Sequence, residues 1–115
     1  MTIRELETRF GMQTLQAEYE DRGLSGGYTS DLLSDVMANA AEGMALITIQ
    51  SHTNTVAVAA MTGIVALVIC NNRPVPDEMV QAAKEEGIAV FLTGEDQFTV
   101  SGKLYAALQQ GTPEA

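Results

Sequence analysis

Residues 64–70 read IVALVIC, and every one of these seven positions is apolar. An uninterrupted apolar run of this length is typical of a β-strand that is covered on both faces, as the strands of parallel sheets are. Two further short segments, 44–49 (MALITI) and 88–92 (IAVFL), have the same character. The three segments therefore predict buried strands of one parallel sheet.

Helical segments alternate with these strands. They are predicted at 31–42, 54–62, 77–86 and 93–110. Gly63 and Gly87 follow two of them directly, and glycine is the residue that most often ends a helix. Because strands and helices alternate from residue 31 onward, the chain predicts parallel strands joined by right-handed crossovers, with helices on both faces.

The N-terminal part adds a short helix at 2–10 and a weakly alternating strand at 12–18, and residues 19–28 are expected to form a loop. No linker or low-complexity segment divides the chain, and its length fits one domain. The sequence thus predicts a single α/β domain over residues 1–115. It has three layers, a mostly parallel central sheet of about five strands, and a last few residues that are disordered.

Two helices carry apolar residues whose spacing predicts which face is buried. In the helix after Asp31, five residues share one face: Leu32, Leu33, Val36, Met37 and Ala40. In the last helix, Phe98, Tyr105 and Leu108 are expected to point inward. Both sets are therefore predicted to join the core.

The formal net charge of −9 and the sequence pI of about 4.3 exclude several partner classes. Nucleic acid and anionic membrane surfaces repel such a chain. No apolar run reaches membrane-spanning length, and the N-terminus lacks the apolar core of a signal peptide. With Cys70 as the one cysteine, no intramolecular disulfide can form. These observations predict a cytoplasmic protein without nucleic-acid or membrane contacts.

Polar residues follow the predicted strands, where open α/β sheets bind ligands. The candidates at these strand ends are His52, Asn54, Asn72 and Arg73. Side chains of this kind also cap strand ends and helices, so a purely structural role stays open for each.

A glycine-rich loop with both an acid and a base precedes residue 31. Its candidate ligand-binding residues are Asp21, Arg22, Ser25, Gly26, Gly27 and Ser30. An arginine, a hydroxyl and flexible glycine amides beside a helix start are groups that hold an anion. The same loop can also serve only to turn the chain.

No catalytic or metal-binding motif is complete. His52 is the only histidine, and no second ligand stands at metal spacing, so neither a metal site nor a cofactor is expected. Residues 101–104 (SGKL) end like a phosphate-binding P-loop, but the motif requires Ser or Thr where Leu104 stands. The sequence therefore favours a protein that is not an enzyme.

Residues 21–28 (DRGLSGGY) resemble the signature of the DRTGG domain family, named for Asp-Arg-Thr-Gly-Gly. Residues 21–22 and 26–27 match this signature, Ser25 replaces the threonine, and residues 23–24 are additional. Three further stretches resemble standalone members of the family: 26–40, 47–59 and 76–88. The resemblance spans nearly the whole chain as one DRTGG-like domain.

This resemblance implies a regulatory module of the kind found beside CBS domains in pyrophosphatases and within phosphate acetyltransferases. It also implies a fold related to the N-terminal domain of HPr kinase, whose catalytic P-loop domain this chain lacks, so a kinase label is unsupported. Standalone members are associated with anaerobic bacteria and archaea, which implies a prokaryotic source.

The leading hypothesis is a non-catalytic regulatory or ligand-sensing domain that acts as a homodimer and binds a nucleotide or phosphorylated metabolite. An alternative is a structural or interaction protein that docks on a larger redox or metabolic complex. A third is a small enzyme that uses His52, or Asp21 with Arg22.

Overall fold

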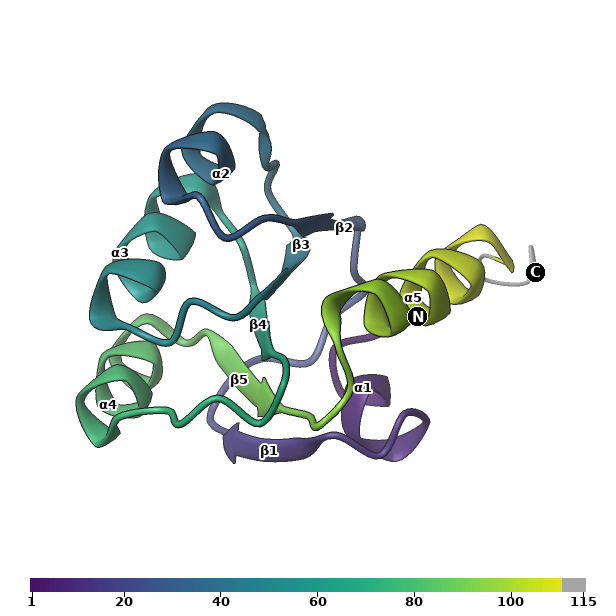
Figure 1. The fold of residues 1–115 in the computed structure, drawn as a ribbon, viewed down its shortest axis with the longest axis horizontal. Helices are drawn as coiled ribbons and strands as arrows, with labels where there is room; N and C mark the ends of the chain where they lie inside the picture. Colours follow the sequence, from purple (N-terminus) through teal and green to yellow (C-terminus); the bar gives the residue numbers. More distant parts are fainter. Residues whose placement is uncertain (111–115) are drawn as a thin grey trace.

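The computed structural model describes residues 1–110 as an α/β domain of five strands and five helices (Figure 1). The elements in chain order are α1 (Glu5–Thr8), β1 (Gln13–Gln16), β2 (Gly26–Thr29), α2 (Leu33–Asn39), β3 (Met44–Thr48), α3 (Thr53–Thr62), β4 (Ala66–Ile69), α4 (Asp77–Glu86), β5 (Ala89–Leu92) and α5 (Gln97–Gln110). The expected disorder of the last residues concerns positions 111–115, which lie outside this description.

The sheet has the order β1-β5-β4-β3-β2, so strands β2 to β5 lie side by side in chain order. These four strands are parallel, and β1 closes the far edge by pairing antiparallel with β5. Because crossovers are right-handed, three consecutive steps in one direction put α2, α3 and α4 on the same face. Helices α1 and α5 cover the other face (Figure 1).

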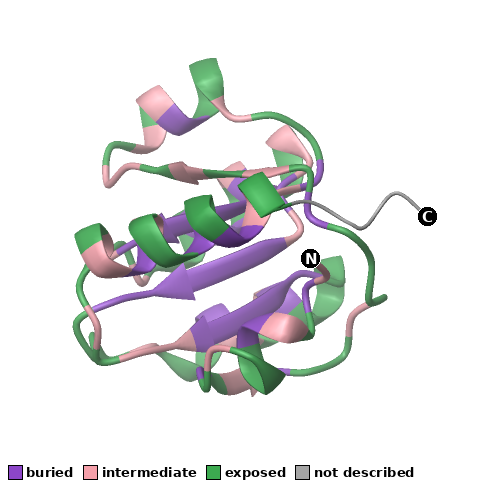
Figure 2. Cartoon of the chain, turned by 90° about the vertical axis from the view of Figure 1, so that its right-hand side faces the viewer, coloured by how far each residue is buried: buried purple, intermediate pink, exposed green. Residues whose placement is uncertain are grey.

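Two apolar cores fill the space between the layers. Figure 2 shows the buried strands between helices whose outer surfaces are exposed. The larger side chains of the first core, between the sheet and α1 and α5, include Leu6, Phe91 and Leu104. The second core, beneath α2, α3 and α4, includes Leu67 and Met79. The predicted three-layer α/β fold is therefore confirmed.

The expected loop at 19–28 is wrong at its C-terminal end. Gly26–Thr29 forms strand β2, which pairs in parallel with β3 from Gly26 opposite Met44 to Thr29 opposite Ile47. The sequence does not predict β2 as a strand, because the segment contains two glycines, which are depleted in strands, and has no apolar run. As an edge strand, β2 is held by one neighbour and needs little apolar surface of its own.

The prediction that Phe98 and Tyr105 point inward is also wrong. Their exposed fractions are 87% and 66%, whereas Leu108 is half-buried as expected of a flanking residue. The buried stripe of α5 is made of Val100, Leu104 and Ala107. Smaller side chains fit between α5 and the sheet, and the two aromatic rings lie on the opposite side of the helix.

Helix α2 is shorter and more exposed than its apolar face predicts. It ends at Asn39, four residues before Gly43, and Val36 is its one fully buried residue. Leu32 and Met37 are exposed. The helix lies at the edge of the molecule and packs on α3 alone among the helices, so only a narrow stripe is covered.

Cys70 lies fully buried just after β4. Burial raises the pKa of its thiol to about 11, and the carboxylates of Asp31, Asp96 and Glu95 add to the shift. At pH 8 the folded protein should therefore hold about a hundredfold less thiolate at this position than an unperturbed thiol, and thiolate is the form that reacts.

We expect iodoacetamide to alkylate Cys70 at least about a hundredfold more slowly in the native protein than in urea at pH 8. Mass spectrometry of timed samples measures both rates. Equal rates in the two conditions would contradict the buried position of this thiol.

None of the helices within residues 1–110 combines the length and the apolar character that crossing a bilayer requires.

Candidate functional site

The parallel strands place the candidate residues at two opposite edges of the sheet. The first group lies where β2 begins, at the amino edge, and consists of Asp21, Arg22, Ser25, Gly26 and Gly27. The second group follows β2, β3 and β4 at the carboxyl edge and consists of Ser30, His52, Asn54, Asn72 and Arg73. The two groups therefore cannot line one common site.

Two of the amino-edge residues hold the chain in place. Asp21 Oδ1 accepts a hydrogen bond from the Arg4 backbone N–H, at 2.9 Å, and so caps α1. Ser25 Oγ donates to the Glu42 carbonyl at 2.8 Å, and the Ser25 N–H donates to the Gly43 carbonyl. These contacts tie the loop to α1 and to the α2–β3 connection.

Arg22 lines a hollow of about 230 Å³ at the same edge. Glu42 and Glu86 line it as well, and the helices α3 and α4 end there. Helix C-termini carry partial negative charge. Arg22 therefore shares this hollow with two acidic side chains and two helix C-termini, and anion binding by Arg22 stays a prediction.

Gly26 and Gly27 do not adopt the positive φ that glycine permits, because both lie in the extended β2 strand. A Cβ built on Gly27 would lie 3.9 Å from Ile47 Cδ1, on the side of the sheet that α5 covers. The missing side chain at Gly27 therefore leaves space between the edge strand and α5.

This space is a groove in two connected parts, which we name the β2–α5 groove. The larger part has a volume of about 380 Å³ and the smaller about 120 Å³. Gly27, Tyr105 and Leu108 line both parts. The remaining lining residues are Met1, Leu24, Ser25, Gly26, Met44 and Gln109 in the larger part, and Thr29, Ile47, Ser101 and Leu104 in the smaller.

The smaller part of the groove is chiefly apolar, whereas polar and apolar groups contribute about equally to the lining of the larger part. Thr29 Oγ1 and Ser101 Oγ share a hydrogen bond of 2.7 Å that joins β2 to α5. Tyr105 lies at the rim with most of its ring in solvent. The volume of the β2–α5 groove falls in the range of small-molecule sites, and its lining combines apolar walls with polar groups, as such sites do.

The carboxyl edge is organised by Asp31, a residue that the sequence does not single out. Its Oδ1 accepts hydrogen bonds from Thr48 Oγ1 at 2.8 Å, from the Ile49 N–H at 2.9 Å and from Gln97 Nε2 at 3.0 Å. Gln50 Nε2 donates to the Asp31 carbonyl. One carboxylate thus links the ends of β2 and β3 to the start of α5.

The carboxyl-edge candidates mostly cap local structure. His52 Nδ1 accepts from the Asn54 N–H at 3.1 Å and so caps α3, which leaves the proton of a neutral imidazole on Nε2. Ser30 Oγ accepts from the Leu32 N–H ahead of α2. These contacts support structural roles for His52 and Ser30.

Asn71 and Asn72 form a left-handed turn, with φ of 61° and 51°. The Arg73 N–H closes the turn on the Cys70 carbonyl, while the Asn72 N–H donates to the Thr93 carbonyl at 2.9 Å. Asparagine tolerates this conformation better than most residues. The turn docks the end of β4 on the loop after β5 and leaves the Arg73 side chain exposed.

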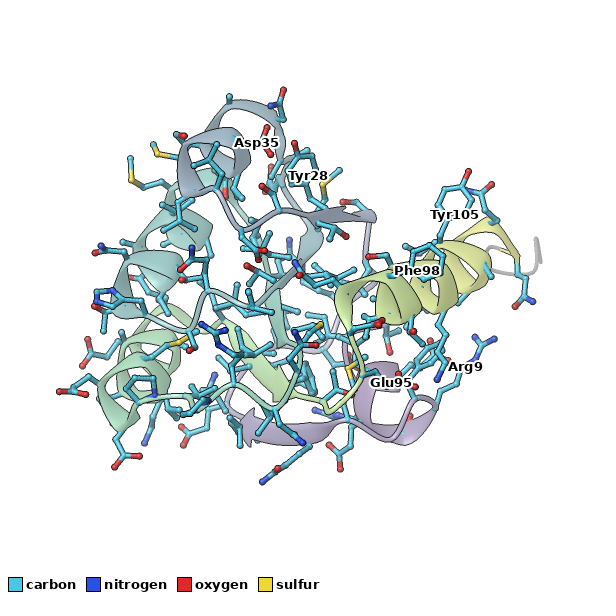
Figure 3. The ribbon with its side chains drawn as sticks, viewed as in Figure 1. Arg9, Tyr28, Asp35, Glu95, Phe98 and Tyr105 are labelled. Carbon is cyan, nitrogen blue, oxygen red and sulfur yellow. The ribbon has the colours of Figure 1, made fainter. Side chains whose placement is uncertain are left out.

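Two carboxylates have pKa values that hydrogen bonds lower. Tyr28 Oη donates to Asp35 Oδ2 at 2.8 Å, which lowers the pKa of Asp35 and raises that of the phenol (Figure 3). The backbone N–H of Thr99 donates to Asp96 Oδ1 and lowers the pKa of that carboxylate at the start of α5. Both acids therefore carry structural hydrogen bonds.

Comparison with known proteins finds a similar fold among solved structures. No protein-family model and no curated protein matches the chain. Among solved structures, it is similar to the CBS and DRTGG domains of the regulatory region of a Clostridium perfringens pyrophosphatase, a structure that contains the activator diadenosine tetraphosphate. The TM-score is 0.68 at 14% sequence identity, over 89% of this chain and 44% of that one. This chain therefore spans less than half of its neighbour.

Proposed function

We propose that this chain, which has the fold of a DRTGG-type domain, is a non-catalytic regulatory domain that senses a small ligand and acts as a homodimer. The observation that carries the ligand part is the β2–α5 groove, and Gly27 lines both of its parts. It is built on the glycine pair of the family signature and is closed by the last helix.

The chemistry of the groove fits a flat, largely uncharged group. Leu24, Met44 and Leu108 supply apolar walls, and the Tyr105 ring at the rim can stack on a heterocycle. The hydroxyls of Thr29 and Ser101 lie at one end. Among residues 1–110, no lysine, arginine, aspartate or glutamate side chain lines the groove, so these residues offer phosphate groups no charged partner there.

A nucleotide is the first ligand class to test. Its base matches the groove, and the regulatory region of similar fold was solved with a dinucleotide activator. The same class follows from the resemblance of residues 21–28 to the family signature. The base would therefore supply most of the binding free energy.

Thermal unfolding with adenine and guanine nucleotides, including diadenosine tetraphosphate, tests this proposal. A ligand that binds only the native state at a hundred times its Kd adds about 2.7 kcal/mol, which raises Tm by several degrees. Gly27→Val should reduce the Tm rise, because its side chain narrows both parts of the groove while valine suits a strand.

Gly23→Ala is the matched control, because a Cβ at Gly23 meets only the Met1 carbonyl, at 3.9 Å, and Gly23 does not line the groove. This variant should keep the full nucleotide response. A flat response of the unmodified protein to every nucleotide, or an undiminished response of Gly27→Val, would refute the groove as the sensing site.

The non-catalytic part of the proposal rests on the carboxyl edge, where enzymes of open α/β folds place their chemistry. There Asp31 accepts three hydrogen bonds from the protein, and His52 Nδ1 caps a helix. Groups that hold the fold in this way are not arranged as a nucleophile with its base.

A further inference from the structure

The outer side of α5 carries a second stripe, separate from the one that packs on the sheet. It consists of Phe98, Gly102, Tyr105 and Gln109, which we name the α5 seam, and Tyr105 and Gln109 also line the neighbouring rim of the β2–α5 groove. Their spacing of four, three and four residues is the pattern by which one helix packs along another. Figure 3 shows Phe98 and Tyr105 on the same side of α5. All four residues are exposed within the single chain.

Gly102 has no role within the chain that explains a glycine. It lies in the middle of a 14-residue helix, where glycine is less favourable than alanine. A Cβ added there would meet no atom within 4 Å, so no neighbouring segment of the domain requires its small size. At the centre of an exposed aromatic stripe, a glycine permits close approach of another backbone.

The absence of charged residues from the α5 seam indicates which kind of partner it fits. The chain has a net charge of −9, yet Lys103 is the only charged residue of α5, and it pairs with Glu95 away from the seam. A basic partner would find no carboxylate on the seam, and an acidic one no cation. A second neutral seam is its complement, and contact there avoids juxtaposing the acidic surfaces of two copies.

We propose that two copies of this chain pair through the α5 seam, with their helices antiparallel and crossing at Gly102. This inference rests on the proposed homodimer and names its interface. Phe98 lies four residues before Gly102, and Tyr105 lies three residues after it. In an antiparallel pair, Phe98 of one copy therefore faces Tyr105 of the other, and two-fold symmetry makes this contact occur twice. The two glycines meet at the axis.

The size of this interface predicts a dimer that dissociates on dilution. Four aromatic side chains would bury on the order of 600 Å². Contacts between the two helix backbones and by Gln109 add to this buried area. The total buried surface then approaches about 1,200 Å², which is the lower limit for specific interfaces. Self-association should therefore depend on concentration in the micromolar range.

Sedimentation velocity over a concentration series tests the pairing with two charge-matched variants. Gly102→Glu places two carboxylates and two side chains at the crossing and should raise the dimer dissociation constant at least tenfold. Gln81→Glu adds the same charge on the exposed face of α4 and should change it less than twofold. Phe98→Ala, at an exposed position, should weaken the dimer without lowering the monomer's Tm.

Circular dichroism verifies that Gly102→Glu stays folded, which is expected because glutamate favours a helix more than glycine does. A dimer with the same dissociation constant in Gly102→Glu and in the unmodified protein overturns the α5 seam and leaves the proposed homodimer standing. A monomer at every concentration of the unmodified protein overturns both. A concentration-dependent dimer that is lost in Gly102→Glu and kept in Gln81→Glu supports both.

Discussion

Replacing Asp31 by alanine is expected to lower the free energy of unfolding by about 3 kcal/mol. The Asp31 carboxylate accepts three hydrogen bonds that join β3 and α5 to the end of β2. Thr48 is fully buried, so its hydroxyl would lose its acceptor where water cannot replace it.

Urea unfolding monitored by circular dichroism measures this loss. Glu85→Ala is the control, since it removes an exposed carboxylate from α4 and should change stability by less than about 0.5 kcal/mol. Asp31→Asn should fall between the two, because its amide oxygen still accepts hydrogen bonds. An Asp31→Ala variant as stable as Glu85→Ala would show that the carboxyl edge is held together without this residue.

Gly63→Ala is expected to destabilise the fold by about 2–3 kcal/mol, and Gly87→Ala by only about 1 kcal/mol. Both glycines end a helix in the left-handed conformation, with φ of 82° and 68°. A Cβ at Gly63 would lie 2.9 Å from Glu42 Cγ and 3.0 Å from Glu42 Cα, whereas one at Gly87 meets nothing within 4 Å. The difference between the variants therefore measures the contact with Glu42.

The same urea titration serves for this pair, with unchanged denaturant slopes as the criterion that both variants remain two-state. Gly63 and Gly43 also meet directly, since the Gly43 N–H donates to the Gly63 carbonyl at 2.8 Å. Equal destabilisation of the two variants would mean that the α2–β3 connection moves aside at no cost.

The strands of the central sheet could be predicted because their residues are apolar without interruption. Residues 64–70 and 88–92 are apolar throughout, as positions covered on both faces must be. The helix ends at Gly63 and Gly87 could be predicted as well, because glycine readily adopts the positive φ that ends a helix, as both residues do here. Strand β2 could not, because an edge strand with two glycines depends on pairing with β3 instead of on its own side chains.

The candidate site was less predictable, because its partners are distant in the sequence. Gln97 reaches Asp31 across 66 residues, and Ser101 reaches Thr29 across 72. Spacing along the chain cannot reveal such contacts. Phe98 and Tyr105 were assigned to the core because they are the largest apolar residues of their helix, whereas Val100, Leu104 and Ala107 fit the narrow space. Gly26 and Gly27, expected in a loop, lie in strand β2 and line the groove, and a role in ligand binding stays a prediction for them.

The pairing of β1 with β5 has a consequence for how the chain acquires its structure. Strands β3, β4 and β5 each join the strand that precedes them, so this part can assemble progressively through short loop closures. Gln13, however, pairs with Leu92, and no partner for the N-terminal strand exists until the C-terminal third is available. During synthesis the first strand therefore stays unpaired until β5 is available, and we expect its docking, the strand pairing of greatest sequence separation in the sheet, to be a late step of folding.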